Sequence, residues 1–140
     1  MVSVVSAYAP QSGLCDTVKD KFYDDLLEAV SSLGENELAM VAGDLNGHVG
    51  RAGDGYDGVH GGYGFGDHNL EGERILEFGD ATGMMVGNTL FKKRVSRLVT
   101  YQSGDVSSQI DYILFRKTNR KMVKDVKVIA GKNVLLRTNW

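Results

Sequence analysis

The decisive stretch of this chain is Val41-Ala42-Gly43-Asp44-Leu45-Asn46, and Gln109-Ile110-Asp111-Tyr112-Ile113-Leu114 repeats its pattern. Each stretch is an apolar run, typical of a strand, that carries an aspartate. If the first strand continues through Asn46, Asp44 and Asn46 lie on one face, because side chains two residues apart in a strand point the same way. Acids and amides at strand ends suit a divalent metal and a water directed at a phosphate. The two stretches therefore predict a hydrolytic site.

The two aspartates differ in how strongly they indicate function. Asp44 could equally be a turn or N-cap residue after a buried strand. Asp111 lies between Ile110 and the apolar run 112–114, where a charge is costly unless it has a partner. Taken together, the two acids favour function over a purely structural role.

Composition excludes several classes of protein. The 140 residues suffice for one domain with a real core, and a net charge of −2 offers no general attraction for nucleic acid, although a local basic patch stays possible. The single cysteine, Cys15, excludes an internal disulfide and a thiolate metal cluster. No apolar run approaches the roughly 18 residues of a membrane span, and residues 1–5 lack the basic start of a secretory signal. We expect an intracellular protein with no membrane partner and of unspecified oligomeric state.

The remaining pattern alternates strands and helices. Asp16 or Thr17 is expected to cap the first helix, Gly34 to end it, and Asn69 to cap the second. Ten glycines between residues 43 and 66 predict a long functional or mobile loop. The order predicts an α/β architecture with a mixed sheet. The expected strands are 2–7 (buried), 37–42, 84–86, 98–101, 110–115 and 126–129, and the expected helices are 16–33 and 69–81.

Two other patterns carry little weight. The glycines of 53–58 match dinucleotide-binding spacing, but this segment lies within a loop instead of between a strand and a helix. The spacing of His48, His60 and His68 matches no compact zinc pattern, which favours surface histidines. His48 is of interest because it lies just beyond Asn46.

Four ordered motifs carry a resemblance to a known superfamily. Gly43-Asp44-Leu45-Asn46 and Ile110-Asp111-Tyr112-Ile113 resemble the endonuclease/exonuclease/phosphatase superfamily, which includes apurinic-site endonucleases and the nicking domain of LINE-type retrotransposons. Tyr8-Ala9-Pro10 is similar to the tyrosine-containing turn that follows an internal strand in that superfamily. Residues 69–74 and 87–91 resemble the retrotransposon branch and the related craniofacial development protein 2 group. The resemblance covers residues 2 to about 131.

The resemblance implies a fold and a reaction. The fold is a four-layered α/β sandwich of two mixed sheets flanked by helices, and the reaction is hydrolysis of a phosphodiester, usually in DNA, with Mg²⁺ or Mn²⁺. Carried onto this chain, Asp44 would orient or deprotonate the attacking water and is the candidate metal ligand. Asn46 and Tyr8 would contact the scissile phosphate. Asp111 would orient a catalytic histidine.

The chain departs from the superfamily at both ends. Residues 132–140 contain no counterpart of the terminal histidine motif, and the metal-binding glutamate of an amino-terminal segment also has none. We therefore expect a partial domain over residues 1–131, a divergent tail over 132–140, and a nuclease that is weak or inactive alone. A nuclear location is implied by resemblance.

Three alternatives stay open. His48 or another chain could supply the histidine, or the chain could act as a phosphatase on small phosphoesters. The third is a non-catalytic nucleic-acid-binding or interaction module that uses the basic last quarter. In that quarter, solvated faces are favoured over a backbone-binding strip. Its basic residues include Arg116, Lys117, Arg120, Lys121, Lys124, Lys127 and Lys132.

Overall fold

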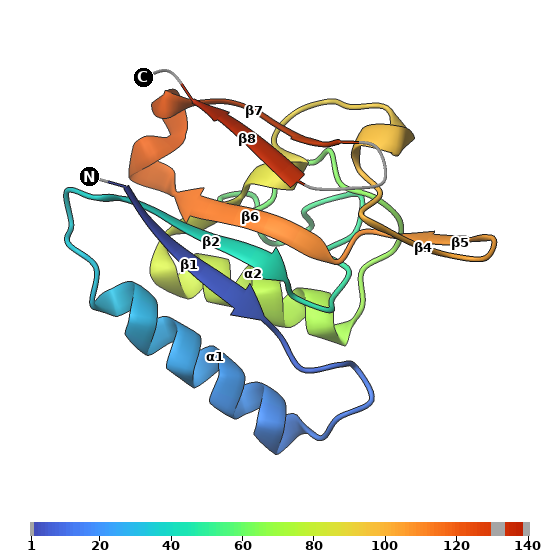
Figure 1. The fold of residues 1–140 in the computed structure, drawn as a ribbon, viewed down its shortest axis with the longest axis horizontal. Coiled ribbons are helices and arrows are strands. Elements are labelled where there is room, and N and C mark those ends of the chain that lie inside the picture. Colours follow the sequence, from blue (N-terminus) through green and yellow to red (C-terminus); the bar gives the residue numbers. More distant parts are fainter. Residues whose placement is uncertain (1, 130–133, 139–140) are drawn as a thin grey trace.

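The computed structural model describes residues 2–129 and the strand at 134–138. Two helices, three short 3₁₀ turns and eight strands follow one another along this part of the chain (Figure 1). In chain order the elements are β1 (Val2–Tyr8), α1 (Asp16–Ser31), β2 (Leu38–Asp44), α2 (Leu70–Thr82), β3 (Met84–Val86), η1 (Gly87–Thr89), η2 (Val95–Arg97), β4 (Tyr101–Ser103), β5 (Val106–Ser108), β6 (Asp111–Arg116), η3 (Lys117–Met122), β7 (Val123–Val128) and β8 (Val134–Thr138).

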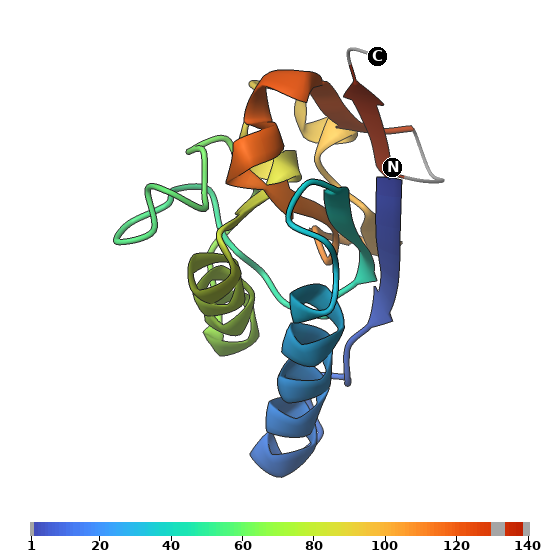
Figure 2. The ribbon, with the colours of Figure 1, turned by 90° about the vertical axis from the view of Figure 1, so that its left-hand side faces the viewer.

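A four-stranded mixed sheet of order β1-β2-β6-β3 forms the centre of the fold. β1 runs parallel to β2, whereas β6 runs antiparallel to both β2 and β3. Both helices cover one face of this sheet (Figure 2) and enclose a core that includes Val41, Ile75 and Leu114. On the opposite face Val123 and Val126 of the β7–β8 pair pack against β6. The predicted α/β architecture, with two sheets and helices outside them, is confirmed.

The two helices begin differently. α2 is capped as predicted, because the Asn69 side chain accepts a hydrogen bond from the Gly72 amide at 2.8 Å. α1 ends at Ser31 and has Cys15 at its N-cap without a side-chain bond, so the predicted capping by Asp16 or Thr17 is wrong. Asp16 instead pairs with an arginine of α2.

β1 is an edge strand, not the fully buried strand that its apolar sequence predicts. Alternate residues are exposed, with Val2 and Val4 at 44% and 57% of their full accessibility. Val5 and Ala7 point to the opposite side and pack under the helices. The prediction of a buried strand failed because β1 is buried on one face only.

The glycine-rich segment is a loop, as predicted, but it is folded around a buried side chain. His60 is only 3% exposed, so its prediction as a surface histidine is wrong. Its Nε2 lies 2.7 Å from the Gly50 carbonyl, and its Nδ1 accepts a hydrogen bond from the Gly62 amide at 2.9 Å. These two bonds are satisfied together by a neutral ring that carries its proton on Nε2.

The predicted strand over 98–101 is also wrong. The chain there leaves the 3₁₀ turn η2 and enters the short hairpin of β4 and β5, which extends away from the body of the molecule (Figure 1). Gly104 supplies the left-handed turn residue, with φ of 59°. Of the segment 132–140, only β8 belongs to the described residues, and β8 pairs with β7. No helix of the described part of the chain has the length and hydropathy that a membrane span requires.

Candidate active site

Three strands bring the predicted site residues together at one end of the central sheet. Tyr8 at the end of β1 is in register with Asp44 at the end of β2, and Asp44 is in register with Asp111 at the start of β6. Residues paired in this way project from the same face of a sheet. We call Tyr8, Asp44, Asn46 and Asp111 the acidic end of the sheet. It lies on the side that faces away from the helices, where the arrowheads of β1 and β2 meet the start of β6 (Figure 1).

Gly43 allows β1 and β2 to approach closely just before this end. Its φ is 149°, and a Cβ atom there would lie 1.8 Å from the Ala7 carbonyl oxygen. Only glycine fits such a position, because any side chain would collide with backbone. The close approach holds Tyr8 and Asp44 side by side.

Asn46 lies in a turn and not on the strand. β2 ends at Asp44, and Asn46 has a left-handed φ of 46°, so the predicted strand spacing of Asp44 and Asn46 is wrong. The Asn46 amide donates to Asp44 Oδ1 at 2.9 Å, which is the hydrogen bond of an Asx turn. The Asn46 side-chain nitrogen donates to the Ala9 carbonyl at 2.7 Å. The turn still brings Asn46 next to Asp44 and to the end of β1.

Asp111 is half-buried and has an internal partner. The Thr100 hydroxyl accepts hydrogen bonds from the amides of Ile110 and Asp111 at 2.9 and 3.1 Å, and it also hydrogen-bonds the Asp111 carboxylate. Burial raises the pKa of Asp111; the Thr100 hydrogen bond opposes this rise, and the charge of Asp44 adds to it. Asp111 therefore holds a proton more readily than an exposed aspartate.

Asn88 continues the sheet where β3 stops. Its side chain is buried, with Oδ1 accepting from the Ile113 amide at 2.9 Å and Nδ2 donating to the Asp111 carbonyl at 3.1 Å. The Asn88 side chain thus makes the hydrogen bonds to the β6 backbone that a neighbouring strand would otherwise make. Sequence reasoning assigned no role to Asn88 or Thr100. The motif at 87–91 could have indicated Asn88, whereas Thr100 has no local signal because its partners are ten residues away or more.

Tyr112 anchors the loop that carries Asn46. It is only 1% exposed, and its hydroxyl lies 2.7 Å from the carbonyls of Gly47 and Gln109. The same hydroxyl accepts a hydrogen bond from the Val49 amide at 3.2 Å. β6 therefore supports the turn after Asp44 through a single buried side chain.

The structure brings no histidine to the acidic end among the described residues. The backbone of His48 is bound to Asn69 at the start of α2, and no hydrogen bond joins its ring to Asp44 or Asp111. His60 lies within the glycine-rich loop, and His68 is exposed. Over residues 2–129 no group of three or more histidine, cysteine, aspartate or glutamate side chains could hold a metal ion.

Asp44 and Asp111 are the two carboxylates of the acidic end that could hold a divalent cation. Asp44 and Asp111 face each other closely enough for the charge of Asp44 to raise the pKa of Asp111. A divalent cation would relieve that repulsion, and Mg²⁺ commonly takes one or two protein carboxylates and completes its shell with water and phosphate. Two carboxylates suit an ion that also binds water and phosphate, and they are too few to supply all of its ligands.

Comparison with known proteins finds two curated relatives. The chain is 31% identical over 132 residues to craniofacial development protein 2 of Bos taurus, and 30% identical over 132 residues to that of Tragulus javanicus. Each alignment covers 93% of this chain but only 22% and 23% of the relatives. The chain therefore spans about a fifth of the length of the curated relatives it matches. No family model matches the chain.

A solved structure shares the fold. The endonuclease domain of TRAS1, a telomere-specific non-LTR retrotransposon, superposes with a TM-score of 0.56 at 12% sequence identity. The superposition covers 86% of this chain and 52% of that domain. The likeness establishes the fold, and about half of the TRAS1 domain has a counterpart here.

Proposed function

We propose a function for this chain from the premise that it is an endonuclease/exonuclease/phosphatase-like partial domain, similar in sequence to craniofacial development protein 2. The proposed function is to bind a phosphodiester of DNA at the acidic end, as the phosphate-binding and water-orienting part of a metal-dependent hydrolytic site. One observation carries this proposal: Tyr8, Asp44 and Asp111 lie in direct register on three adjacent strands, with Asn46 held beside them.

Each residue of the acidic end would have a separate role. The Tyr8 side chain is 69% exposed, so its hydroxyl is accessible to a phosphate oxygen. Asn46 uses one side-chain N–H on Ala9, and the described residues provide no partner for the second, which can donate to the same phosphate. Asp44 would orient a water for in-line attack. Asp111 would share a divalent cation with Asp44, and that cation would relieve the repulsion between the two carboxylates.

A divalent cation such as Mg²⁺ or Mn²⁺, held by Asp44 and Asp111, would polarise the phosphate and lower the pKa of a bound water. The chain's own residues then fix the substrate. Tyr8 and Asn46 approach from the β1 side, and Asp111 approaches from β6.

We expect little or no hydrolysis by the chain alone. In the described residues Asp111 is hydrogen-bonded to Thr100 and not to an imidazole, so a strong proton donor for the leaving oxygen is not in place. The second candidate function is therefore a module that binds nucleic acid without cleaving it. The two candidates share the acidic end and differ only in turnover.

A binding assay and a nicking assay distinguish these candidates. Fluorescence anisotropy with a short DNA duplex is measured with Mg²⁺ and with EDTA for the wild type, for Asp44→Ala and for the control Asp24→Ala on the exposed side of α1. Mg²⁺ is expected to tighten binding by the wild type and the control but not by Asp44→Ala. An absence of any Mg²⁺ effect in the wild type would contradict the proposed site. Robust plasmid nicking that Asp44→Ala abolishes would show that the chain alone is an active nuclease.

A further inference from the structure

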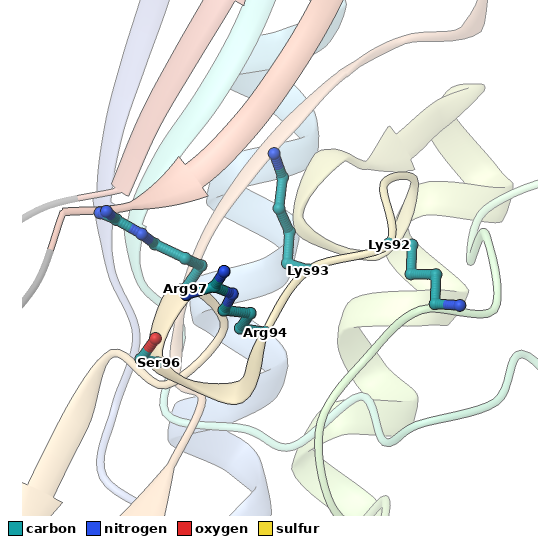
Figure 3. Close-up of a pocket in the computed structure, with 5 residues that line it drawn as sticks. All are labelled: Lys92, Lys93, Arg94, Ser96 and Arg97. Atoms are coloured by element: carbon teal, nitrogen blue, oxygen red, sulfur yellow. The ribbon is translucent and has the colours of Figure 1, made fainter.

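A basic turn precedes Thr100, the residue that supports Asp111, and has no assigned role. It comprises residues 92–97, and its side chains Lys92, Lys93, Arg94, Ser96 and Arg97 line a hollow of about 500 Å³ (Figure 3). No acidic side chain lines this hollow. A protein with a net charge of −2 thus concentrates four cations within six residues. Concentrated charge of this kind attracts an anion locally even when the whole surface does not.

A backbone hydrogen bond holds Arg94 and Arg97 at the two ends of the same turn. The Arg97 amide donates to the Arg94 carbonyl at 2.9 Å, which closes the 3₁₀ turn η2. Figure 3 shows the Arg94 and Arg97 side chains on the side of the turn opposite to Lys92, with the Arg97 guanidinium extending away from the Ser96 hydroxyl.

The four cationic side chains of the turn differ in whether they already have a partner within the fold. Lys93 forms an ion pair with Asp125 at 2.6 Å, and one Arg97 nitrogen donates to the Val128 carbonyl at 3.2 Å. Arg94 and Lys92 have no partner within the described residues. The hollow gathers four cationic side chains and no acidic one, so a bound oxyanion would neutralise part of this concentrated positive charge. Phosphate suits the two arginines because the planar guanidinium donates two parallel hydrogen bonds to its oxygens.

The basic turn is anchored to the same strand end as Asp111. The buried Gln109 side chain donates to the Leu98 carbonyl at 3.1 Å, directly after the turn. Two residues later Thr100 supports Asp111. Since a chain extends at most about 3.6 Å per residue, the Cα atoms of Arg97 and Thr100 lie within about 11 Å of each other.

We propose that Arg94, Ser96 and Arg97 bind a backbone phosphate of the DNA strand that crosses the acidic end. This inference rests on the proposed function, because it assigns the same nucleic acid a second contact. The basic last quarter is less suited to this role. Arg116 donates to the Gly34 carbonyl at 2.6 Å, and Arg120 donates to the Val123 carbonyl at 3.1 Å and stacks on Phe91, so both arginines are used within the fold.

Salt-dependent DNA binding in EDTA tests the proposal without cleavage. Anisotropy with a labelled duplex is recorded between 50 and 200 mM salt for the wild type, Arg94→Gln and Arg94→Lys. Lys92→Gln is the matched control, because it removes one charge from the same turn on its other side. Arg94→Gln is expected to make the slope of log K against log salt shallower by about 0.9 and to weaken binding about tenfold at 50 mM. Arg94→Lys is expected to retain the slope, and Lys92→Gln to change it little.

Each outcome separates this inference from the proposed function. DNA binding that strengthens with Mg²⁺ but has the same slope in Arg94→Gln as in the wild type would overturn the phosphate contact and leave the proposed function standing. Equal slope changes in Arg94→Gln and Lys92→Gln would also overturn it, because the effect would then be general charge. If Arg94→Gln weakens binding to a labelled oligoglutamate as much as it weakens binding to DNA, the turn would instead be assigned to an acidic protein partner. No binding of DNA by the wild type would contradict both proposals.

Discussion

Replacing Tyr112 by phenylalanine is the sharpest test of how the acidic end is supported. The substitution removes a single oxygen from a side chain that is 1% exposed. It leaves the Val49 amide without its acceptor and deprives the carbonyl of Gly47 or Gln109 of its donor. A buried polar group left unpaired costs about 1–3 kcal/mol, so two such groups predict a loss of about 2–6 kcal/mol. For a chain of this size that loss lowers the melting temperature by roughly 6–18 °C.

Urea unfolding followed by circular dichroism measures this loss, with Tyr8→Phe as the matched control. The Tyr8 hydroxyl is exposed and has no partner within the described residues, so its removal should change stability by less than about 0.5 kcal/mol. Because Tyr112 holds the loop that follows Asn46, its substitution should also weaken Mg²⁺-dependent DNA binding. A loss below about 0.5 kcal/mol for Tyr112→Phe would refute the reasoning, since the three contacts would then carry no net stability.

Three further substitutions or conditions give distinct results. Gly72→Ala should lower the free energy of unfolding by about 3 kcal/mol or prevent folding, because the added Cβ would lie 1.7 Å from the His48 carbonyl oxygen. Urea titrations should show the stability falling as the pH drops below about 6.5, because burial lowers the pKa of His60 and the unfolded chain then binds more protons. Asp111→Asn should raise the urea midpoint at pH 7. Burial raises the pKa of Asp111, so keeping this carboxylate ionised at pH 7 lowers the free energy of unfolding, and protonation at lower pH restores it.

Each of these predictions has a control that could contradict it. Gly13→Ala adds a Cβ with no heavy atom within 4 Å, so an equal loss there would refute the argument from close approach. An acid transition that is unchanged by replacing His60 with glutamine would show that another group is responsible. For Asp111→Asn, a lower midpoint than that of the exposed-site variant Asp24→Asn would show that the carboxylate contributes net stability.

Local sequence patterns predicted most of the elements correctly. Helical spacing located α1, apolar runs located β2, β3 and β6, and alternation located β7, because these patterns reflect burial on one or both faces. The second helix was located from its cap, Asn69. The apolar run of β1 did not reveal that the strand lies at a sheet edge, since strand order depends on the whole chain. The hairpin that replaces the strand expected at 98–101 had a local signal in Ser103-Gly104-Asp105, where Gly104 takes the left-handed conformation.

The acidic end was only partly predictable. The two apolar runs identified Asp44 and Asp111, but their register is a long-range property that only the folded sheet displays. The expected geometry of Asn46 was wrong because an Asx turn, and not a continued strand, follows Asp44. His60 was predicted at the surface because its loop is polar and rich in glycine, yet its two ring nitrogens are both satisfied by backbone groups of that loop.

The most direct test of the central claim is a nuclear magnetic resonance titration of the ¹⁵N-labelled chain with a phosphodiester-linked dinucleotide in the presence of Mg²⁺. The account predicts that the largest amide shifts occur at Tyr8, Asp44, Asn46 and Asp111, and that Asp44→Ala removes them. Saturating shifts confined to other parts of the chain, or no shifts at millimolar dinucleotide, would contradict the claim that this end of the sheet binds a phosphodiester.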